Sequence, residues 1–248
     1  MVPNGVILKE NSAAKFLPEA NSITLNDGSS VSYDILVVAA GIQIDWEKIP
    51  GLSSALKDKS SGVVSIYDYD YSAAAWPVFD TIEKGRILFT MPATLIKCAG
   101  APQKIMWLVE ELLRDKKIRD KTSVEFWVPG AAMFGVKKYA DMLEEIRKEK
   151  GVEAKFRNEL VSIDSTTKTA VFKSLNDNST SKEHYDVLHV VPPMSAPDFI
   201  KASPLADANG WLDVNKFTLQ SPKYPNVFAL GDCTNSPNRS GKVYKYNK

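Results

Sequence analysis

The sequence has 248 residues, of which 44% are hydrophobic and 25% are charged, and its formal net charge is +1. This composition is ordinary for a globular protein, and the near-zero charge argues against a nucleic-acid partner. The two cysteines lie far apart and form no CxxC, so neither a disulfide framework nor a zinc motif is expected. No apolar run approaches the roughly 18 residues of a membrane-spanning helix.

The first part of the chain predicts a small antiparallel sheet that leads into a buried strand. Short strands are expected at residues 6–8, 14–17, 22–25 and 30–33. The triplet Asn26-Asp27-Gly28 is typical of a hairpin turn. The following run, residues 33–41, predicts a fully buried parallel strand that ends in small residues. Ala40 and Gly41 at its end would let a flat ligand approach the backbone closely, although a plain core strand has the same pattern.

The middle of the chain predicts alternating helices and strands. After a linker at residues 45–52, an amphipathic helix is expected at 67–82, with a kink or restart at Pro77. Strands are expected at 87–90, 123–128 and 152–156, with helices from Gln103 and at 137–149. A second antiparallel set is expected at 160–165, 168–172 and 181–185, followed by a buried strand at 187–191 that carries His189 as a core residue.

Cys98 lies in the turn between the strand at 87–90 and the helix that begins near Gln103. A helix N-terminus favours negative charge, and Lys97 and Lys104 act in the same direction, so this position favours the thiolate. A thiolate attacks sulfur or a flavin ring. The alternative is that Cys98 is a small buried hydrophobic residue.

The last part of the chain predicts strands at 211–214 and 224–232, the second ending in Gly231-Asp232. An acidic residue directly after a buried strand can accept a hydrogen bond from a sugar or ribityl hydroxyl. It can equally cap the helix that follows. Cys233 is expected to be a packed thiol.

An internal repeat supports a two-domain fold. Residues 22–41 and 160–193 both read as a hairpin, a Tyr-Asp pair and a buried strand followed by small or proline residues. We therefore predict an α/β protein with two dinucleotide-binding, Rossmann-like domains with antiparallel insertions, the first incomplete. The predicted domains are a discontinuous FAD-binding domain, residues 1–52 and 200–248, and a central NAD-like domain, residues 53–199, that carries the redox cysteine.

Four segments resemble the mitochondrial type of sulfide:quinone oxidoreductase within the two-dinucleotide-domain, disulfide-reductase-like flavoproteins. They are KCAGAPQKIM (97–106), FGVKKYAD (134–141), LHVVPPMSAPD (188–198) and YPNVFALGDCTN (224–235). The resemblance implies an FAD enzyme on the matrix side of the mitochondrial inner membrane. Such an enzyme oxidises hydrogen sulfide through a cysteine persulfide, reduces ubiquinone and passes sulfane sulfur to glutathione or sulfite.

The resemblance also assigns the candidate site residues. Cys98 matches the cysteine that lies against the flavin and is the catalytic candidate. The cofactor-binding candidates are Ala40, Gly41, Lys104, Pro193, Met194, Gly231 and Asp232. No metal site is expected.

Two other functions stay open at this stage. An NADH:quinone oxidoreductase of the same flavoprotein group would need a G-x-G-x-x-G turn, but residues 90–95 read TMPATL there. A non-catalytic fragment or pseudoenzyme is the other alternative. The resemblance predicts a chain that lacks an N-terminal glycine-rich βαβ unit, a second redox cysteine and the membrane-docking helices. It also predicts that the polar segment after Pro237 is unlike the helix expected there, and that the chain alone binds FAD weakly or not at all.

Overall fold

The computed structural model describes residues 2–236 and divides the chain into two compact units. The central unit is the continuous segment Ile44–Met194, and the split unit combines Met1–Gln43 with Ser195–Lys248. The two segments that join the units contain the short paired strands β5 (Gln43–Ile44) and β14 (Met194–Ser195). The predicted polar segment after Pro237 lies outside the described residues.

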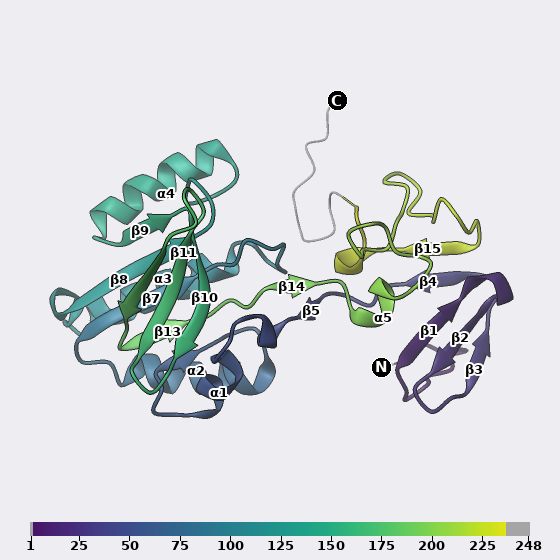
Figure 1. The fold of residues 1–248 in the computed structure, drawn as a ribbon, viewed down its shortest axis with the longest axis horizontal. Helices are drawn as coiled ribbons and strands as arrows, with labels where there is room; N and C mark the ends of the chain where they lie inside the picture. Colours follow the sequence, from purple (N-terminus) through teal and green to yellow (C-terminus); the bar gives the residue numbers. More distant parts are fainter. Residues whose placement is uncertain (1, 237–248) are drawn as a thin grey trace. The chain divides into compact units, whose positions relative to one another are not determined.

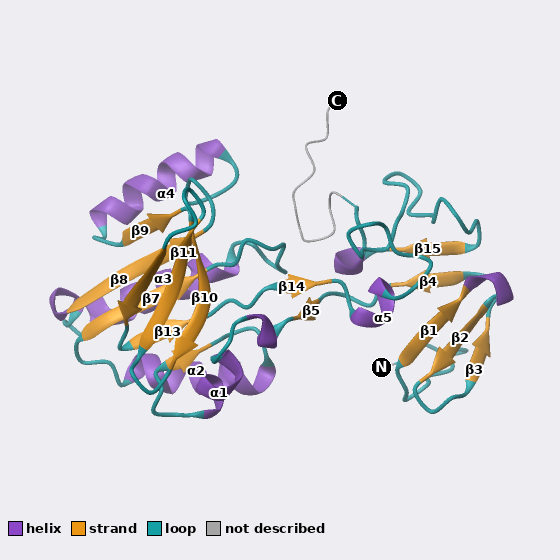
Figure 2. Cartoon of the chain, in the orientation of Figure 1, coloured by secondary structure: helices purple, strands orange, loops and turns teal. Residues whose placement is uncertain are grey.

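The central unit is built on a five-stranded sheet in which every neighbouring pair is parallel. Figure 2 shows these strands in orange. This sheet and the helices that connect its strands confirm the predicted α/β class. In spatial order the strands are β6 (Val63–Val64), β13 (Val187–His189), β7 (Gly85–Thr90), β8 (Thr122–Val128) and β9 (Glu153–Phe156).

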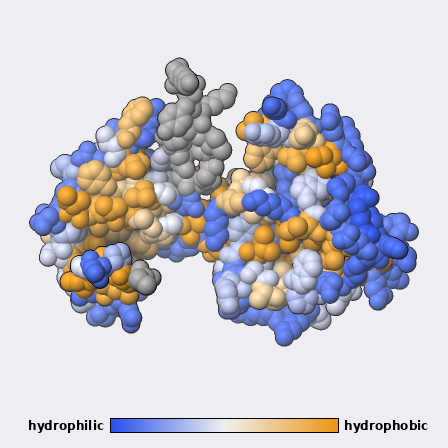
Figure 3. Space-filling view, turned by 180° about the vertical axis from the view of Figure 1, so that it is seen from behind, coloured by the Kyte–Doolittle hydropathy of each residue, from blue (hydrophilic) through white to orange (hydrophobic). Residues whose placement is uncertain are grey.

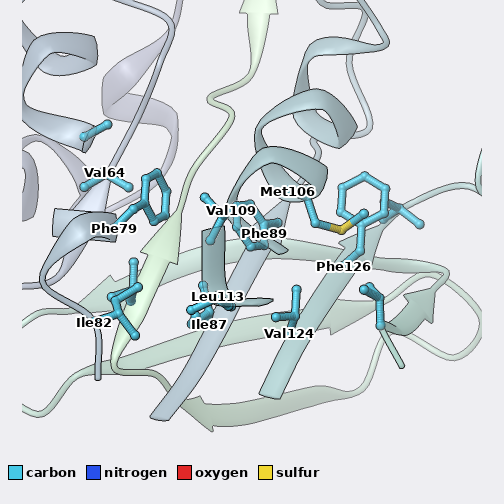
Figure 4. Close-up of a cluster of buried hydrophobic side chains, with 14 of the residues drawn as sticks. Val64, Phe79, Ile82, Ile87, Phe89, Met106, Val109, Leu113, Val124 and Phe126 are labelled. Carbon is cyan, nitrogen blue, oxygen red and sulfur yellow. The ribbon is translucent and has the colours of Figure 1, made fainter. Parts of the chain in front are cut away.

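Helices cover one face of the parallel sheet. Ile87 and Phe89 alternate with Leu88 along β7, and because successive strand side chains point to opposite faces, they enter the helix-side core. There they pack with Phe79 and Met106, as Figure 4 shows. Helices α2 (Tyr69–Asp80), α3 (Ala101–Asp115) and α4 (Lys137–Glu149) pack in this core, whereas α1 (Leu52–Lys57) contributes Leu52 and Ala55 to the cluster on the other face.

An antiparallel sheet covers the other face. Leu88 of β7 points to this side and belongs to the same buried cluster as Phe172. The rings of Trp127 and Phe172 stack with centroids 3.9 Å apart. Figure 1 shows this second sheet in front of the parallel one, so the unit has three layers. Its strands are β10 (Asn158–Asp164), β11 (Thr169–Ser174) and β12 (Thr180–His184).

A buried carboxylate fixes α3 to the segment after α4. Glu110 is fully buried, and its oxygens accept hydrogen bonds from Arg114 Nε at 2.5 Å and Lys150 Nζ at 2.9 Å. A buried charge is tolerated only when it is paired in this way. The helix that carries Lys104 is therefore held in position by more than apolar packing.

The split unit repeats the same plan on a smaller scale. An antiparallel sheet of β1 (Ala13–Leu17), β2 (Ser22–Leu25) and β3 (Ser30–Ser32) precedes a parallel pair, β4 (Leu36–Val38) with β15 (Val227–Ala229). The predicted hairpin is confirmed, with Gly28 at a φ of +82°. The short helix α5 (Asp198–Lys201) packs Ile200 into this unit's core.

Two predictions of local structure are wrong, because residues 6–8 and 211–214 form no strand. Helix α2 includes Pro77 and does not restart there. Val6, Ile7 and Leu8 are 56%, 83% and 63% exposed. Apolar residues with strand propensity form a strand only where another strand pairs with them. Leu212 makes only isolated bridges, to Ala206 and Thr234.

The strand at 33–41 is shorter than predicted and is not fully buried. Leu36 and Val38 face the core of the split unit, whereas Ile35 and Val37 are 66% and 57% exposed. The face drawn in Figure 3 shows hydrophobic residues at the surface of both units. Between residues 2 and 236, the structure contains no helix with the length and apolarity needed to cross a membrane.

The burial of His189 predicts that the central unit loses folding stability in acid. Burial lowers the pKa of this ring to about 3, and neither ring nitrogen has a partner among the described residues. The unfolded chain takes up a proton below the usual pKa of about 6.5, so stability is lost as the pH falls from there towards 3. This residue alone should cost about 2 kcal/mol between pH 7 and pH 5.

His189→Phe should remove that part of the pH dependence, as measured by urea unfolding at both pH values. His184→Gln is the control, because the His184 side chain is 62% exposed. An identical loss of stability in wild type and His189→Phe would contradict the assignment.

Candidate functional site

In the central unit, three chain segments leave the same edge of the parallel sheet. Strands β6, β13 and β7 are neighbours, so residues 65–67, 190–194 and 91–100 all follow the carboxyl ends of adjacent strands. Ligands of open α/β sheets bind outside the carboxyl ends of the strands. This edge therefore holds the candidate site of the central unit.

Hydrogen bonds tie the segment after β7 to the segment after β13. Thr90 Oγ1 donates to the carbonyl of His189 at 3.2 Å and accepts from the N–H of Val191 at 3.3 Å. The N–H of Met194 donates to Thr94 Oγ1 at 3.0 Å. The N–H of Lys97 donates to Met194 Sδ at 3.4 Å, which fixes the backbone directly before Cys98. Both threonines thus stabilise the loop.

Cys98 is exposed on this loop and has a left-handed backbone, with a φ of +53°. Non-glycine residues adopt this conformation uncommonly, and it is concentrated at functional sites. Lys104 Nζ lies 3.7 Å from Cys98 Sγ, within charge-assisted hydrogen-bond reach. The structure therefore brings these two predicted residues together.

The N-terminus of α3 offers fewer free N–H groups to the Cys98 sulfur than its position suggests. The N–H of Ala101 donates to the carbonyl of Cys98 at 2.9 Å, and Pro102 has no N–H. Two of the groups that a helix N-terminus usually offers are thus not available to the Cys98 sulfur. The side chain of Lys104 is the group that the structure places beside the sulfur.

The predicted residues Pro193 and Met194 are both buried at this edge. The carbonyl of Pro193 accepts from the N–H of Asp45 at 2.9 Å, and Met194 contacts the loop as described above. The contacts of Met194 position the Cys98 loop, whereas Pro193 is bonded to the segment after β5.

Tyr67 is a residue that the sequence reasoning missed. It follows β6, is only 6% exposed, and its hydroxyl has no hydrogen-bond partner among the described residues. Burial, and then the nearby Cys98 sulfur, raise the pKa of Tyr67 above its usual value. Lys97 Nζ lies 6.0 Å from the centroid of the Tyr67 ring. A tyrosine after a short apolar strand is too common a pattern to have indicated this role.

In the split unit, two glycines lie at the carboxyl ends of paired strands. The N–H of Leu230 donates to the carbonyl of Val38 at 3.0 Å, which joins the two strand ends. Gly41 and Gly231 follow with φ values of +72° and +78°. A Cβ added at either glycine would meet no atom within 4 Å, so both face open space. Ala40, next to Gly41, is exposed.

Asp232 and Cys233 belong to the short helix Gly231–Cys233 that follows β15. Asp232 is partly buried. Cys233 is fully buried, and its thiol donates to the carbonyl of Leu230 at 3.3 Å. Burial raises the pKa of Cys233, although N–H groups of Ala40 and Gly41 act against this. The predicted packed thiol is confirmed.

The predicted site residues thus form two sets, one in each unit. Cys98, Lys104, Pro193 and Met194 lie at one sheet edge of the central unit. Ala40, Gly41, Gly231 and Asp232 lie at the strand ends of the split unit. The described part of the chain contains no group of three or more side chains suited to a metal ion.

Comparison with solved structures identifies the fold class first. The sulfide:quinone oxidoreductase from Aquifex aeolicus matches with a TM-score of 0.75 and 19% identity, over 91% of this chain and 52% of that chain. The chain thus has the Rossmann-like α/β fold of the two-domain oxidoreductases, as predicted. No protein-family model matches the chain.

Sequence comparison then gives the particular relatives. The chain is 43% identical over 238 residues to the mitochondrial sulfide:quinone oxidoreductase of Dictyostelium discoideum, covering 95% of this chain and 52% of the relative. The mitochondrial sulfide:quinone oxidoreductase of Mus musculus is also 43% identical over 238 residues, with 96% and 52% covered. The chain is therefore homologous to these enzymes and spans about half the length of the curated relatives it matches.

Lys104 should control the reactivity of Cys98. A unit charge 4 Å away stabilises an anion by about 1 kcal/mol in water, or about fivefold. Lys104→Met should therefore slow alkylation of Cys98 by iodoacetamide at neutral pH about fivefold, as followed by mass spectrometry of the Cys98 peptide.

Lys138→Met is the matched control, because Lys138 is an exposed lysine in the first turn of α4. Equal alkylation rates in wild type and Lys104→Met would show that the ammonium does not act on the sulfur.

Proposed function

We propose that this chain functions in an FAD-dependent sulfide:quinone oxidoreductase, with Cys98 as the residue that receives sulfide sulfur. The observation that carries the proposal is the exposed Cys98 at the carboxyl edge of a parallel sheet, with Lys104 Nζ 3.7 Å from its sulfur. The homology to enzymes of that name supports it.

The proposed reaction joins the Cys98 thiolate to hydrosulfide. An S–S bond forms, one proton leaves, and the product is a Cys98 persulfide anion together with one electron pair. Bound FAD would accept that pair and pass it to ubiquinone. Lys104 would balance the negative charge of the attacking thiolate and of the persulfide. A small acceptor such as glutathione or sulfite would then take the outer sulfur and regenerate the thiolate.

The split unit has features that fit a flavin nucleotide. Gly41 and Gly231 leave open space where a side chain would otherwise stand, so a flat group could approach both strand ends. Asp232 lies beside Gly231 and could accept a hydrogen bond from a ribityl hydroxyl. In this proposal, Ala40 and Gly41 contact the cofactor through the backbone. Lys104, Pro193 and Met194 stay candidates for cofactor binding by the family resemblance alone.

The loop after β7 favours sulfur chemistry over nicotinamide binding. A dinucleotide site brings a glycine-rich turn up to the pyrophosphate. Here Thr90 and Thr94 bond to the segment after β13 instead, and the first glycine of the loop is Gly100, which follows Cys98. The names of the homologues support a mitochondrial location. The matrix side of the inner membrane is proposed from the family resemblance alone.

Cys98→Ser should abolish sulfide-dependent reduction of a quinone by the flavin-loaded protein, because a serine hydroxyl cannot hold a sulfane sulfur. Quinone reduction is followed by absorbance. Cys233→Ser should retain activity, since Cys233 is buried and packed. Undiminished sulfide oxidation by Cys98→Ser would refute the proposed function.

Gly231→Ala should weaken FAD binding. The added Cβ would project into the open space beside Asp232 and would also strain the backbone by about 1 kcal/mol. FAD affinity is measured by flavin fluorescence titration.

Gly28→Ala is the matched control, because Gly28 has a φ of +82° and equally open surroundings but lies in a hairpin turn. Both variants should lose similar stability, and only Gly231→Ala should lose FAD affinity. Equal FAD affinity in the two variants would contradict the cofactor site.

A further inference from the structure

Tyr67 is an unexplained polar group at the candidate site. Its side chain is 6% exposed, and its hydroxyl makes no hydrogen bond with any described residue. A buried hydroxyl without a partner is costly, so each one in a folded protein calls for an explanation such as a ligand. Removal from water also keeps this hydroxyl protonated, and it is therefore a hydrogen-bond donor.

The fold places Tyr67 and Cys98 at the same edge of the parallel sheet. Tyr67 follows β6, Cys98 follows β7, and both strands pair with β13, so the two residues leave the same edge of the sheet. Lys97, the residue before Cys98, has its ammonium 6.0 Å from the centre of the Tyr67 ring. Burial raises the pKa of Tyr67, and a negative charge on the Cys98 sulfur acts in the same direction.

We infer that the Tyr67 hydroxyl binds the outer sulfur of a persulfide on Cys98, donating a hydrogen bond to that anion. An S–S bond extends the cysteine by about 2 Å, which supplies an acceptor atom that the thiol lacks. Lys104 Nζ, 3.7 Å from the inner sulfur, then stabilises negative charge on the cysteine sulfur, and Tyr67 binds the outer sulfur. The site is thus selective for a small sulfur anion. This inference rests on the proposed role of Cys98 as the sulfur carrier.

The test forms the persulfide without any cofactor, in a Cys233→Ser background. The aromatic disulfide reagent dithiobis(nitrobenzoate) converts Cys98 to a mixed disulfide and releases one aryl thiolate. Hydrosulfide then attacks the Cys98 sulfur, an S–S bond forms, and the second aryl thiolate leaves, which gives the Cys98 persulfide. The near-ultraviolet absorbance of the persulfide anion is titrated with acid. The charged groups near it are Lys104, whose Nζ lies 3.7 Å from the Cys98 sulfur, and Lys97, whose Nζ lies 6.0 Å from the centroid of the Tyr67 ring.

Tyr67→Phe should raise the pH midpoint of this titration by about one unit, because the anion loses a hydrogen bond. The variant should fold, since the hydroxyl that it lacks is unpartnered, and circular dichroism checks this. Tyr185→Phe is the matched control. Tyr185 also has a buried hydroxyl without a partner among the described residues, but the charges that act on it are those of Asp164 and Asp58. The midpoint of the Cys98 persulfide titration should therefore not change in Tyr185→Phe.

Two results would overturn the inference, and they differ. If the persulfide forms and Tyr67→Phe titrates like wild type, Tyr67 does not bind the outer sulfur, while the proposed role of Cys98 stands. If hydrosulfide yields no persulfide on wild-type Cys98, the role of Cys98 and the inference both fail.

Discussion

The parallel pairing of β7 with β13 is the constraint on which the central unit depends. Its register sets Ile87 opposite Val187 and Phe89 opposite His189, and it brings the chain after Thr90 beside the chain after His189. The two hydrogen bonds of Thr90 Oγ1 extend that contact beyond the strands. The loop that carries Cys98 is consequently held on a sheet edge whose position the core packing of β7 determines.

The same edge combines groups of different chemical kinds. Cys98 is exposed and conformationally unusual, and Lys104 supplies a positive charge from α3. Tyr67, in the segment after β6, supplies a hydroxyl donor that has no partner among residues 2–236. The three residues come from the loop after β7, from helix α3 and from the segment after β6. The proximity of Cys98 and Lys104 follows from one turn and the helix after it, whereas the packed layers of the scaffold bring Tyr67 to the same edge.

Much of the fold could be predicted from the sequence, because long periodic segments are determined locally. Helix α4 and strands β7, β8 and β10–β12 follow directly from apolar spacing and turn residues. The failures occurred where tertiary context decides the outcome. Residues 6–8 have strand propensity but no pairing strand, and Val37 belongs to a short strand with one open face. Pro77 lies within α2, where the packing of the helix on the sheet allows the helix to continue without a restart.

The candidate site was predictable only in part, for a similar reason. Cys98 and Lys104 are six residues apart, on a turn and the helix after it, so their proximity follows from local structure. Tyr67 is distant in sequence, and only the strand order β6-β13-β7 reveals its relation to Cys98.

The central claim is that Cys98 carries sulfane sulfur, and mass spectrometry of peptides from flavin-loaded protein during sulfide oxidation tests it most directly. The claim predicts one added sulfur atom on the Cys98 peptide and none on the Cys233 peptide. Sulfide consumption with an unmodified Cys98 peptide throughout would contradict it.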